Sequence, residues 1–222
     1  MKQPELLDLF CNNGGASEGY RRAGFKVTGV DIEPQPGYRG GEFIQADALD
    51  YVAQYGYQYD AITASPPCQP HSWSAARWDK EWLDFLPQTR FMLMTSGKPY
   101  IIENVVGAPM LDPITLCGTQ FGLRVFRHRL FESNITLHAP PKCSHKGKQI
   151  GFGPDDFVTV AGHGGNGSGK LSNWQDAMGI DWMDKDHITQ AIPPAYTHFL
   201  GSQLLNTVRG IQILEKDLHE HA

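Results

Sequence analysis

Short apolar runs alternate with amphipathic stretches along the first hundred residues of the chain. Five of these runs have the length of a buried strand, at residues 6–10, 27–30, 42–45, 60–64 and 100–102. Helical spacing is found at residues 16–23 and 78–95. Gly24 ends the first of these helices well, because glycine readily adopts the left-handed conformation that follows a helix. Strands alternating with helices predict an α/β fold with a doubly wound, parallel sheet.

Polar or small residues recur where the predicted strands end, and they are found at residues 10–15, Asp31, Asp47, Cys68 and Glu103. In doubly wound sheets, ligands bind beyond the carboxyl ends of the strands. A sheet that needed only a core would have no reason to place acids and a thiol at successive strand ends. We therefore expect the functional site at this edge.

The pattern changes after residue 120. Residues 126–131 alternate with the period of a strand, so that Arg127 and Arg129 are expected on one face. Residues 138–172 are rich in glycine, lysine and histidine, and they predict a small loop-rich insertion with one strand at 157–161.

Helical spacing returns from Asn173. Between residues 194 and 214 it predicts one packing stripe, formed by Tyr196, Leu200, Leu204, Val208 and Ile211. We expect a catalytic domain made of residues 1–137 and 173–222, with the insertion at 138–172 between its two parts.

Composition excludes several classes of protein. A chain of 222 residues that is 41% hydrophobic and 19% charged is not disordered, and its apolar runs fall far below the ~18 residues of a membrane span. The first residues lack the apolar stretch of a signal peptide. Four cysteines without a CxxC pair favour reduced thiols. We expect a soluble, cytoplasmic protein with no membrane partner.

The charge is uneven. The net charge is −5, yet residues 122–170 carry +4 and the remainder −9. A basic patch on an acidic body is compatible with a polyanion docking on one face. Chance clustering on a solvated surface explains the charge equally well.

The turn Ser65-Pro66-Pro67-Cys68-Gln69-Pro70 is the strongest local signal. Two prolines stiffen the chain before the thiol, so that the sulfur is held in one direction. A helix N-terminus or an arginine could lower the pKa of Cys68 and supply a thiolate nucleophile. Glu103 is the natural acid–base partner, although a helix cap or a surface ion pair would also explain it.

The other cysteines are expected to be spectators: Cys11, Cys117 and Cys143. Cys143-Ser144-His145 offers two ligand types without a partner pair, which makes a poor zinc site. No metal site is therefore expected.

A cofactor site is indicated at the first three strand ends. Gly14-Gly15 opens a helix after a strand, where backbone N–H groups can approach a nucleotide, but it does not match GxGxxG. Asp31 could accept hydrogen bonds from ribose hydroxyls, and Asp47 could receive an adenine amino group. Each acid alone could equally be a helix N-cap. Together they favour an adenosine-containing cofactor.

Five segments occur in the order used by DNA (cytosine-5)-methyltransferases, and the chain resembles that family over residues 5–205. They are Asp8-Leu9-Phe10-Cys11-Asn12-Asn13-Gly14-Gly15, Pro66-Pro67-Cys68-Gln69, Glu103-Asn104-Val105, Arg127-His128-Arg129 and Ala191-Ile192-Pro193-Pro194. The last segment is similar to the family's C-terminal motif, which precedes a helix that closes the cofactor pocket. The short length resembles compact members found in phages and prophages, which points to restriction-modification, phage self-protection or regulation.

The resemblance implies a Rossmann-like, S-adenosylmethionine-dependent methyltransferase fold and a role for each matching residue. The cofactor would be bound by Phe10, Asn12, Gly14, Gly15, Asp31, Ile32, Asp47, Ala48 and Pro67. Cys68 would attack carbon 6 of a cytosine flipped out of double-stranded DNA, and carbon 5 would take the methyl group. Glu103 would stabilise the protonated ring, and Arg127 and Arg129 would hold the base and its phosphate.

The chain departs from the family's pattern at four places. Asn12 replaces a usual glycine, Val125 a usual glutamine, and Thr189-Gln190 a usual Gly-Asn pair. The insertion is far shorter than the usual target-recognition domain. It offers Lys146, Lys148, His163 and Lys170 to phosphates but few base readers, so a short recognition site or an accessory specificity or restriction partner is expected.

Three other functions stay open at this point. One is a related enzyme that acts on RNA or single-stranded DNA, or that transfers a different group. A second is a non-catalytic nucleic-acid binding relative, and a third is a nucleotide-binding oxidoreductase. The last two leave the rigid Cys68 turn unexplained.

Overall fold

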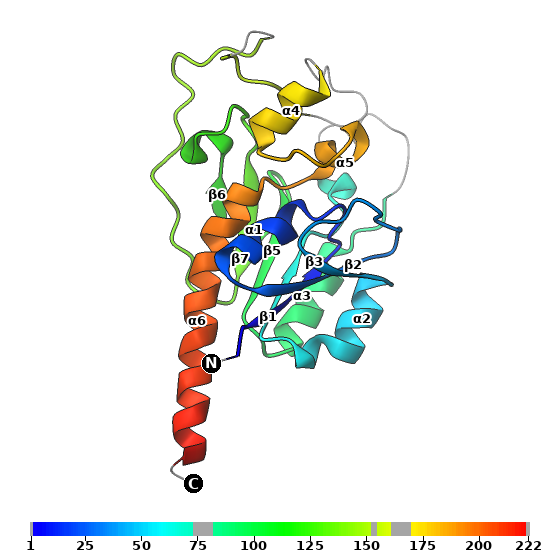
Figure 1. The fold of residues 1–222 in the computed structure, drawn as a ribbon, viewed down its shortest axis with the longest axis vertical. Coiled ribbons are helices and arrows are strands. Elements are labelled where there is room, and N and C mark those ends of the chain that lie inside the picture. The colour runs from blue at the N-terminus through cyan, green and yellow to red at the C-terminus, as the bar shows by residue number, and fades with distance from the viewer. Residues whose placement is uncertain (1, 73–81, 152–154, 161–169, 221–222) are drawn as a thin grey trace.

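The computed structural model describes residues 2–72, 82–151, 155–160 and 170–220. It contains one seven-stranded sheet with the order β3-β2-β1-β4-β5-β7-β6 (Figure 1). The first five of these strands are parallel, whereas β7 is antiparallel to both β5 and β6. The predicted doubly wound, mostly parallel α/β fold is confirmed.

The strands are β1 (Glu5–Leu9), β2 (Lys26–Asp31), β3 (Gly41–Gln45), β4 (Ala61–Ala64), β5 (Tyr100–Val105), β6 (Ile114–Leu116) and β7 (Arg129–Ser133). The α-helices are α1 (Gly15–Ala23), α2 (Ala48–Tyr55), α3 (Leu86–Thr95), α4 (Leu171–Met178), α5 (Lys185–Gln190) and α6 (Pro194–Glu220). Three short 3₁₀ helices are η1 (Gly56–Gln58), η2 (Gln69–His71) and η4 (Gly118–Phe121). None of the helices described here is long and apolar enough to cross a membrane.

Alternate residues of the central strands feed two separate cores. Leu6 and Ile101 pack with α1 and α6 on one face, whereas Leu7 and Ile102 pack with α2 and α3 on the other. This alternation follows from the period of two in a strand, and burial on both faces explains why the strands read as continuous apolar runs.

A third core lies beyond the sheet. Val125, Val158 and Val160 pack against the apolar faces of α4 and α5, which include Trp174 and Ile188. The end of the described insertion therefore shares its core with the helices that follow it.

α6 packs along α1, and Figure 1 shows its C-terminal part extending past the body of the molecule. The two helices approach closely at Gly19, where a Cβ would lie 1.9 Å from Thr197 Oγ1. The predicted stripe is buried from Tyr196 to Val208, but Ile211 is 39% exposed. The prediction was wrong for Ile211 because α6 extends beyond the sheet at that point.

Two further elements differ from the prediction. The helix expected at 78–95 begins only at Leu86, and residues 82–85 are not helical; residues 78–81 lie outside the described part. Pro87 explains the late start, because proline is tolerated only in the first turn of a helix. Phe157 and Val158 form isolated bridges rather than a strand, residues 159–160 are irregular, and Ala161 is not described.

Candidate active site

The turn between β1 and α1 has a left-handed backbone. Phe10, Asn12 and Gly14 have φ angles of 58°, 46° and 80°. Glycine adopts this region freely, and asparagine is among the side chains that tolerate it best. Asn12 also accepts a hydrogen bond from the Asn13 N–H through its own Oδ1, at 2.5 Å. Asparagine at position 12 therefore suits the backbone shape that a glycine would permit.

The glycine pair is required by protein packing. A Cβ at Gly14 would lie 1.7 Å from the carbonyl oxygen of Arg39, and one at Gly15 would lie 2.7 Å from that of Ile192. The sequence interpretation assigned these glycines to the approach of a nucleotide. In the structure, the loop before β3 and the segment before α6 fill the space beside them.

Asp31 and Ile32 follow at the carboxyl end of β2. Asp31 Oδ2 accepts the Asn12 N–H at 2.9 Å, and Oδ1 accepts the Glu33 N–H at 3.1 Å. Each carboxylate oxygen has a further lone pair for another donor. Ile32 is 63% exposed, and Gln45 Nε2 donates to its carbonyl oxygen at 3.1 Å. A fixed carboxylate and an exposed apolar side chain thus stand beside the turn.

Asp47 is the N-cap of α2. Its Oδ1 accepts the N–H groups of Leu49 and Asp50 at 2.8 and 3.0 Å, so the N-cap reading that the sequence left open applies. Ala48 is 3% exposed and packs in the core. Its methyl group is therefore turned away from any ligand outside.

Cys68 caps η2 at the end of a turn that leaves β4. The turn is tied to β5 by Asn104, which is fully buried. Its Nδ2 donates to the Pro66 carbonyl at 3.2 Å, and its Oδ1 accepts the Val105 N–H at 2.9 Å. Asn104 was not among the predicted site residues. The sequence could have indicated Asn104 by its place beside Glu103. A proline-rich turn lacks N–H donors of its own, so its carbonyl groups need donors from elsewhere.

Glu103 and Arg129 form the closest charged pair of the site. Arg129 Nε lies 3.0 Å from Glu103 Oε1, and their side chains are 16% and 11% exposed. Burial raises the pKa of Glu103, while the cations of Arg129 and Arg127 lower it.

Arg127 lies before β7 and is held by backbone carbonyl groups. Nη1 donates to Val160 O at 3.1 Å and Nη2 to Thr189 O at 2.7 Å. The Tyr196 hydroxyl donates to the carbonyl oxygen of Arg127 at 2.6 Å. Burial and the neighbouring cation of Arg129 together lower the pKa of Arg127 to about 9.

The expectation that Arg127 and Arg129 share a strand face was wrong. β7 begins only at Arg129, because the backbone before it pairs elsewhere: Val125 bridges to Val158, and the buried Arg127 side chain donates to the carbonyl groups of residues 160 and 189. Both guanidinium groups nevertheless act on Glu103 and on Cys68.

In the free protein, burial raises the pKa of the Cys68 thiol and Glu103 raises it further, while Arg129 and Arg127 lower it. The sequence interpretation expected a helix N-terminus or an arginine to lower this pKa. The arginines act in that direction, but the loss of hydration and the nearby carboxylate outweigh them.

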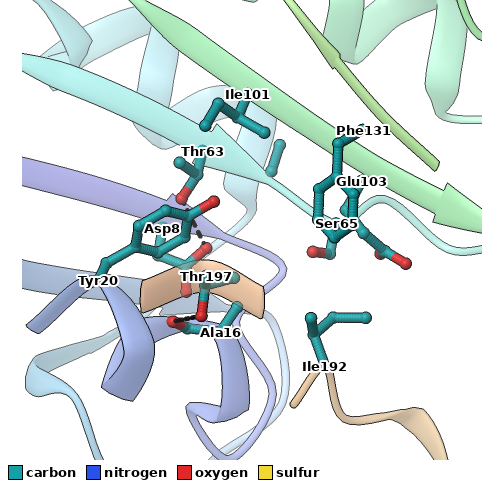
Figure 2. Close-up of a pocket in the computed structure, with 11 residues that line it drawn as sticks. Asp8, Ala16, Tyr20, Thr63, Ser65, Ile101, Glu103, Phe131, Ile192 and Thr197 are labelled. Atoms are coloured by element: carbon teal, nitrogen blue, oxygen red, sulfur yellow. Dashed lines mark hydrogen bonds between the residues drawn. The ribbon is translucent and has the colours of Figure 1, made fainter. Parts of the chain in front are cut away.

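The sheet, α1 and α6 pack around a narrow polar gap that leaves no room for a water molecule. Figure 2 shows Ser65 and Glu103 side by side at one end of it, and Asp8 with Thr63 at the other. Asp8 accepts hydrogen bonds from the hydroxyls of Ser17 and Thr63, at 2.5 and 2.9 Å. Burial raises the pKa of Asp8 to about 6.

At the carboxyl edge of the sheet, the charges of Arg127 and Arg129 affect the pKa values of both Cys68 and Glu103, and Glu103 affects that of Cys68. These four predicted residues therefore belong to one site. The turn at residues 10–14 is joined to Asp31 at the same edge. Phe10 is half-buried with its ring 6.4 Å from that of Phe85, and Pro67 is half-buried in the Cys68 turn.

Comparison with known proteins finds a relative in sequence. The type II methyltransferase M.AgeI of Thalassovita gelatinovora is 27% identical over 189 residues, which cover 66% of this chain and 44% of that protein. The chain thus spans less than half the length of this relative. No family model matches the chain.

Two solved structures share the fold. The Dnmt2 methyltransferase of S. pombe aligns with a TM-score of 0.64 and 14% identity, over 93% of this chain and 99% of that one. The Entamoeba histolytica methyltransferase EhMeth aligns with a TM-score of 0.61 and 12% identity, over 94% and 99%. The fold of this chain is therefore the one found in these two methyltransferases.

Proposed function

We propose that this chain is a cytosine-5 DNA methyltransferase, which transfers a methyl group from S-adenosylmethionine to carbon 5 of a cytosine in DNA. The similarity to a type II methyltransferase in sequence and to methyltransferases in fold supports this proposal. The observation that carries the proposal is the thiol of Cys68, on a rigid turn, under the joint influence of Glu103, Arg127 and Arg129. A protein that only bound nucleic acid would have no need for this combination.

The residues at the first two strand ends suit the cofactor. Asp31 keeps acceptor capacity for ribose hydroxyls while its backbone bonds fix it. Ile32 offers an exposed apolar surface for a purine ring. S-Adenosylmethionine bound there would supply an electrophilic methyl group, and Phe10 and Pro67 would border the same site.

The chain's own residues would carry the base chemistry. The Cys68 thiol gives its proton to water, and Sγ then forms a bond to carbon 6 of cytosine, which makes carbon 5 nucleophilic. Glu103 hydrogen-bonds the ring nitrogen and the exocyclic amine, and so stabilises the protonated ring. Once carbon 5 has taken the methyl group and S-adenosylhomocysteine is left, carbon 5 gives its proton to water, the carbon–sulfur bond breaks, and the released Cys68 thiolate takes up a proton from water.

The guanidinium groups would hold the target. Arg127 Nε has no hydrogen-bond partner among the described residues although it is buried, and such a group calls for a partner. We infer that the base or its phosphate fills this role. The cytosine must leave the double helix to reach Cys68, at a cost of a few kcal/mol.

Residues 138–172 would dock on the DNA backbone around the target. This insertion supplies Lys146, Lys148 and Lys170 to phosphates, while its short length limits direct base readout. A short recognition sequence follows, unless a second protein adds specificity.

The deciding experiment is nucleoside mass spectrometry of DNA from cells that express this chain, beside cells that express Cys68→Ala. 5-Methylcytosine only with the intact chain supports the proposal, and sequencing the modified positions defines the site. A second assay uses DNA with 5-fluorocytosine, in which carbon 5 cannot lose a proton and the Cys68 adduct persists. No modified cytosine and no adduct would reject the proposal, and a cytosine of another mass would reject the methyl donor alone.

A further inference from the structure

Four potential metal ligands converge in the described part of the chain, and none of them is among the residues assigned to the chemistry of Cys68. They are Cys117 between β6 and η4, His128 before β7, and Cys143 and His145 from the insertion. One ligand atom from each of the four residues lies within 4.8 Å of all the others. Three segments that are distant in sequence thus contribute to one cluster.

The spacing of the cluster fits a tetrahedral ion. Cys117 Sγ lies 3.3 Å from His145 Nε2, and Cys143 Sγ lies 3.5 Å from His128 Nε2. Bonds of ~2.3 Å to sulfur and ~2.1 Å to nitrogen place these atoms about 3.6 Å apart around tetrahedral zinc. We propose that Cys117, His128, Cys143 and His145 bind a structural Zn²⁺ ion.

The surroundings of the cluster favour metal binding. The Cys117 N–H donates to Gln120 Oε1 at 2.7 Å, and Gln120 Nε2 donates to Pro141 O at 2.8 Å. Gln120 therefore ties the segment that carries Cys117 to the segment that carries Cys143. Such outer hydrogen bonds orient metal ligands.

An aromatic wall covers the site on the side of the insertion. The ring of Phe126 lies 4.4 Å from that of His145 and is stacked on Phe157 at 4.6 Å.

The insertion has a physical need for the ion. Residues 138–151 are mostly exposed and contain no helix or strand. A segment with so little apolar burial needs a metal or another cross-link to hold one conformation. Four protein ligands leave no open position, which is typical of a structural site and not of a catalytic one.

The sequence interpretation rejected Cys143 and His145 as zinc ligands because it found no second pair. The structure supplies that pair as Cys117 and His128. Because His128 stands between Arg127 and Arg129, the ion would join the insertion to the arginine segment of the active site.

The test is metal analysis of the full chain after purification without histidine tags or chelators. We expect about one zinc per chain by plasma mass spectrometry. Cobalt exchanged into the site is expected to give the visible bands of tetrahedral Co²⁺ and thiolate-to-cobalt charge transfer. Cys143→Ser should lose at least 90% of the bound zinc, whereas Cys68→Ser, a half-buried cysteine outside the cluster, should keep it.

A second pair of variants guards against misfolding. His145→Asn removes a ligand at the exposed edge of the cluster, and His138→Asn removes an exposed histidine outside it. With far-ultraviolet circular dichroism unchanged in both, only the first should lose zinc and expose residues 138–151 to protease. A folded wild-type chain that binds neither zinc nor cobalt, a Cys117–Cys143 disulfide in the purified protein, or full zinc in His145→Asn would overturn the proposal.

Discussion

Arg129 Nε lies 3.0 Å from Glu103 Oε1 across the antiparallel pair β5–β7, with both side chains largely withdrawn from water. The ion pair does not lower the pKa of Glu103 below its ordinary value, because burial has the larger effect. The carboxyl group is therefore biased toward the protonated form that can donate to a ring nitrogen.

Glu103→Gln should separate catalysis from stability. We expect kcat for methyl transfer to fall by at least ~100-fold, the usual loss for a general acid. A raised folded-state pKa means that ionised Glu103 costs stability as pH rises through that pKa. The free energy of unfolding of the variant, measured in urea, should therefore improve relative to wild type between pH 5 and pH 8.

Glu132→Gln is the matched control for that experiment. Glu132 is also buried, on the same strand pairing, but it accepts two hydrogen bonds from Arg90 and one from the Leu111 N–H. This variant should lose stability at both pH values and keep its activity. The reverse pattern would show that Glu103 is a structural carboxylate.

Cys68 should react slowly with alkylating agents at neutral pH. Its pKa is raised by burial and by Glu103, so below that pKa the thiolate fraction grows about tenfold per pH unit. Iodoacetamide labelling of the Cys68 peptide, followed by mass spectrometry from pH 6 to 9, should rise without a plateau. A plateau near pH 7 would mean that the arginines already hold a thiolate.

Asp8 should make the protein less stable as pH rises. Burial raises the pKa of Asp8 to about 6 in the folded chain, against an ordinary value of 3.8. The stabilisation is present in full below pH 3.8 and is lost as pH rises through about 6. The shift corresponds to about 3 kcal/mol of unfolding free energy. Urea unfolding between pH 4 and 7 should show the loss, and Asp8→Asn should remove most of that slope; an unchanged slope would place the effect elsewhere.

Arg127→Lys should destabilise the chain and impair transfer. A lysine cannot donate to Val160 O and Thr189 O in the geometry of the guanidinium group, so one buried carbonyl loses its partner at a cost of about 1–3 kcal/mol. Thermal unfolding and kcat/KM should both fall. Thr189→Ala keeps the carbonyl that Arg127 binds, and full activity is expected of it.

Neutralising Lys146 and Lys148 with glutamine should weaken DNA binding equally for all sequences. Each lost phosphate contact reduces the slope of log K against log salt by about 0.9. Fluorescence anisotropy over a salt series measures this slope. Lys98→Gln, before the amino end of β5 and away from the site, should leave it unchanged. Loss of binding to one sequence only would show that these lysines read bases.

Local rules were sufficient for much of the fold. The spacing of apolar residues predicts five strand positions, the conformational freedom of glycine predicts the left-handed cap at Gly24, and two prolines predict the rigid turn at Cys68. Each of these effects acts within a few residues. The catalytic residues were found through a resemblance to a family. The later elements were less predictable, because Arg127 is drawn out of its expected strand by partners at positions 160 and 189.

The pKa of Cys68 and the zinc ligands could not be read from the sequence for a related reason. The pKa of a thiol depends on desolvation by every residue that packs around it. A sequence motif shows only the residues next to the thiol along the chain, so it does not reveal this effect. Cys117, His128, Cys143 and His145 have no regular spacing, so only the folding of three segments onto one another brings them together.

Arg127 is anchored by two backbone carbonyl oxygens, and such a contact does not depend on the type of residue that supplies the carbonyl group. Any residue at position 160 or 189 presents the same acceptor, provided that the backbone follows the same path. The side chain at position 189 can therefore vary while the hydrogen bond from Arg127 to the carbonyl oxygen at that position is kept. Relatives whose side chains differ throughout this region can share the arrangement. Comparing backbone structures should therefore detect such relatives better than comparing sequences.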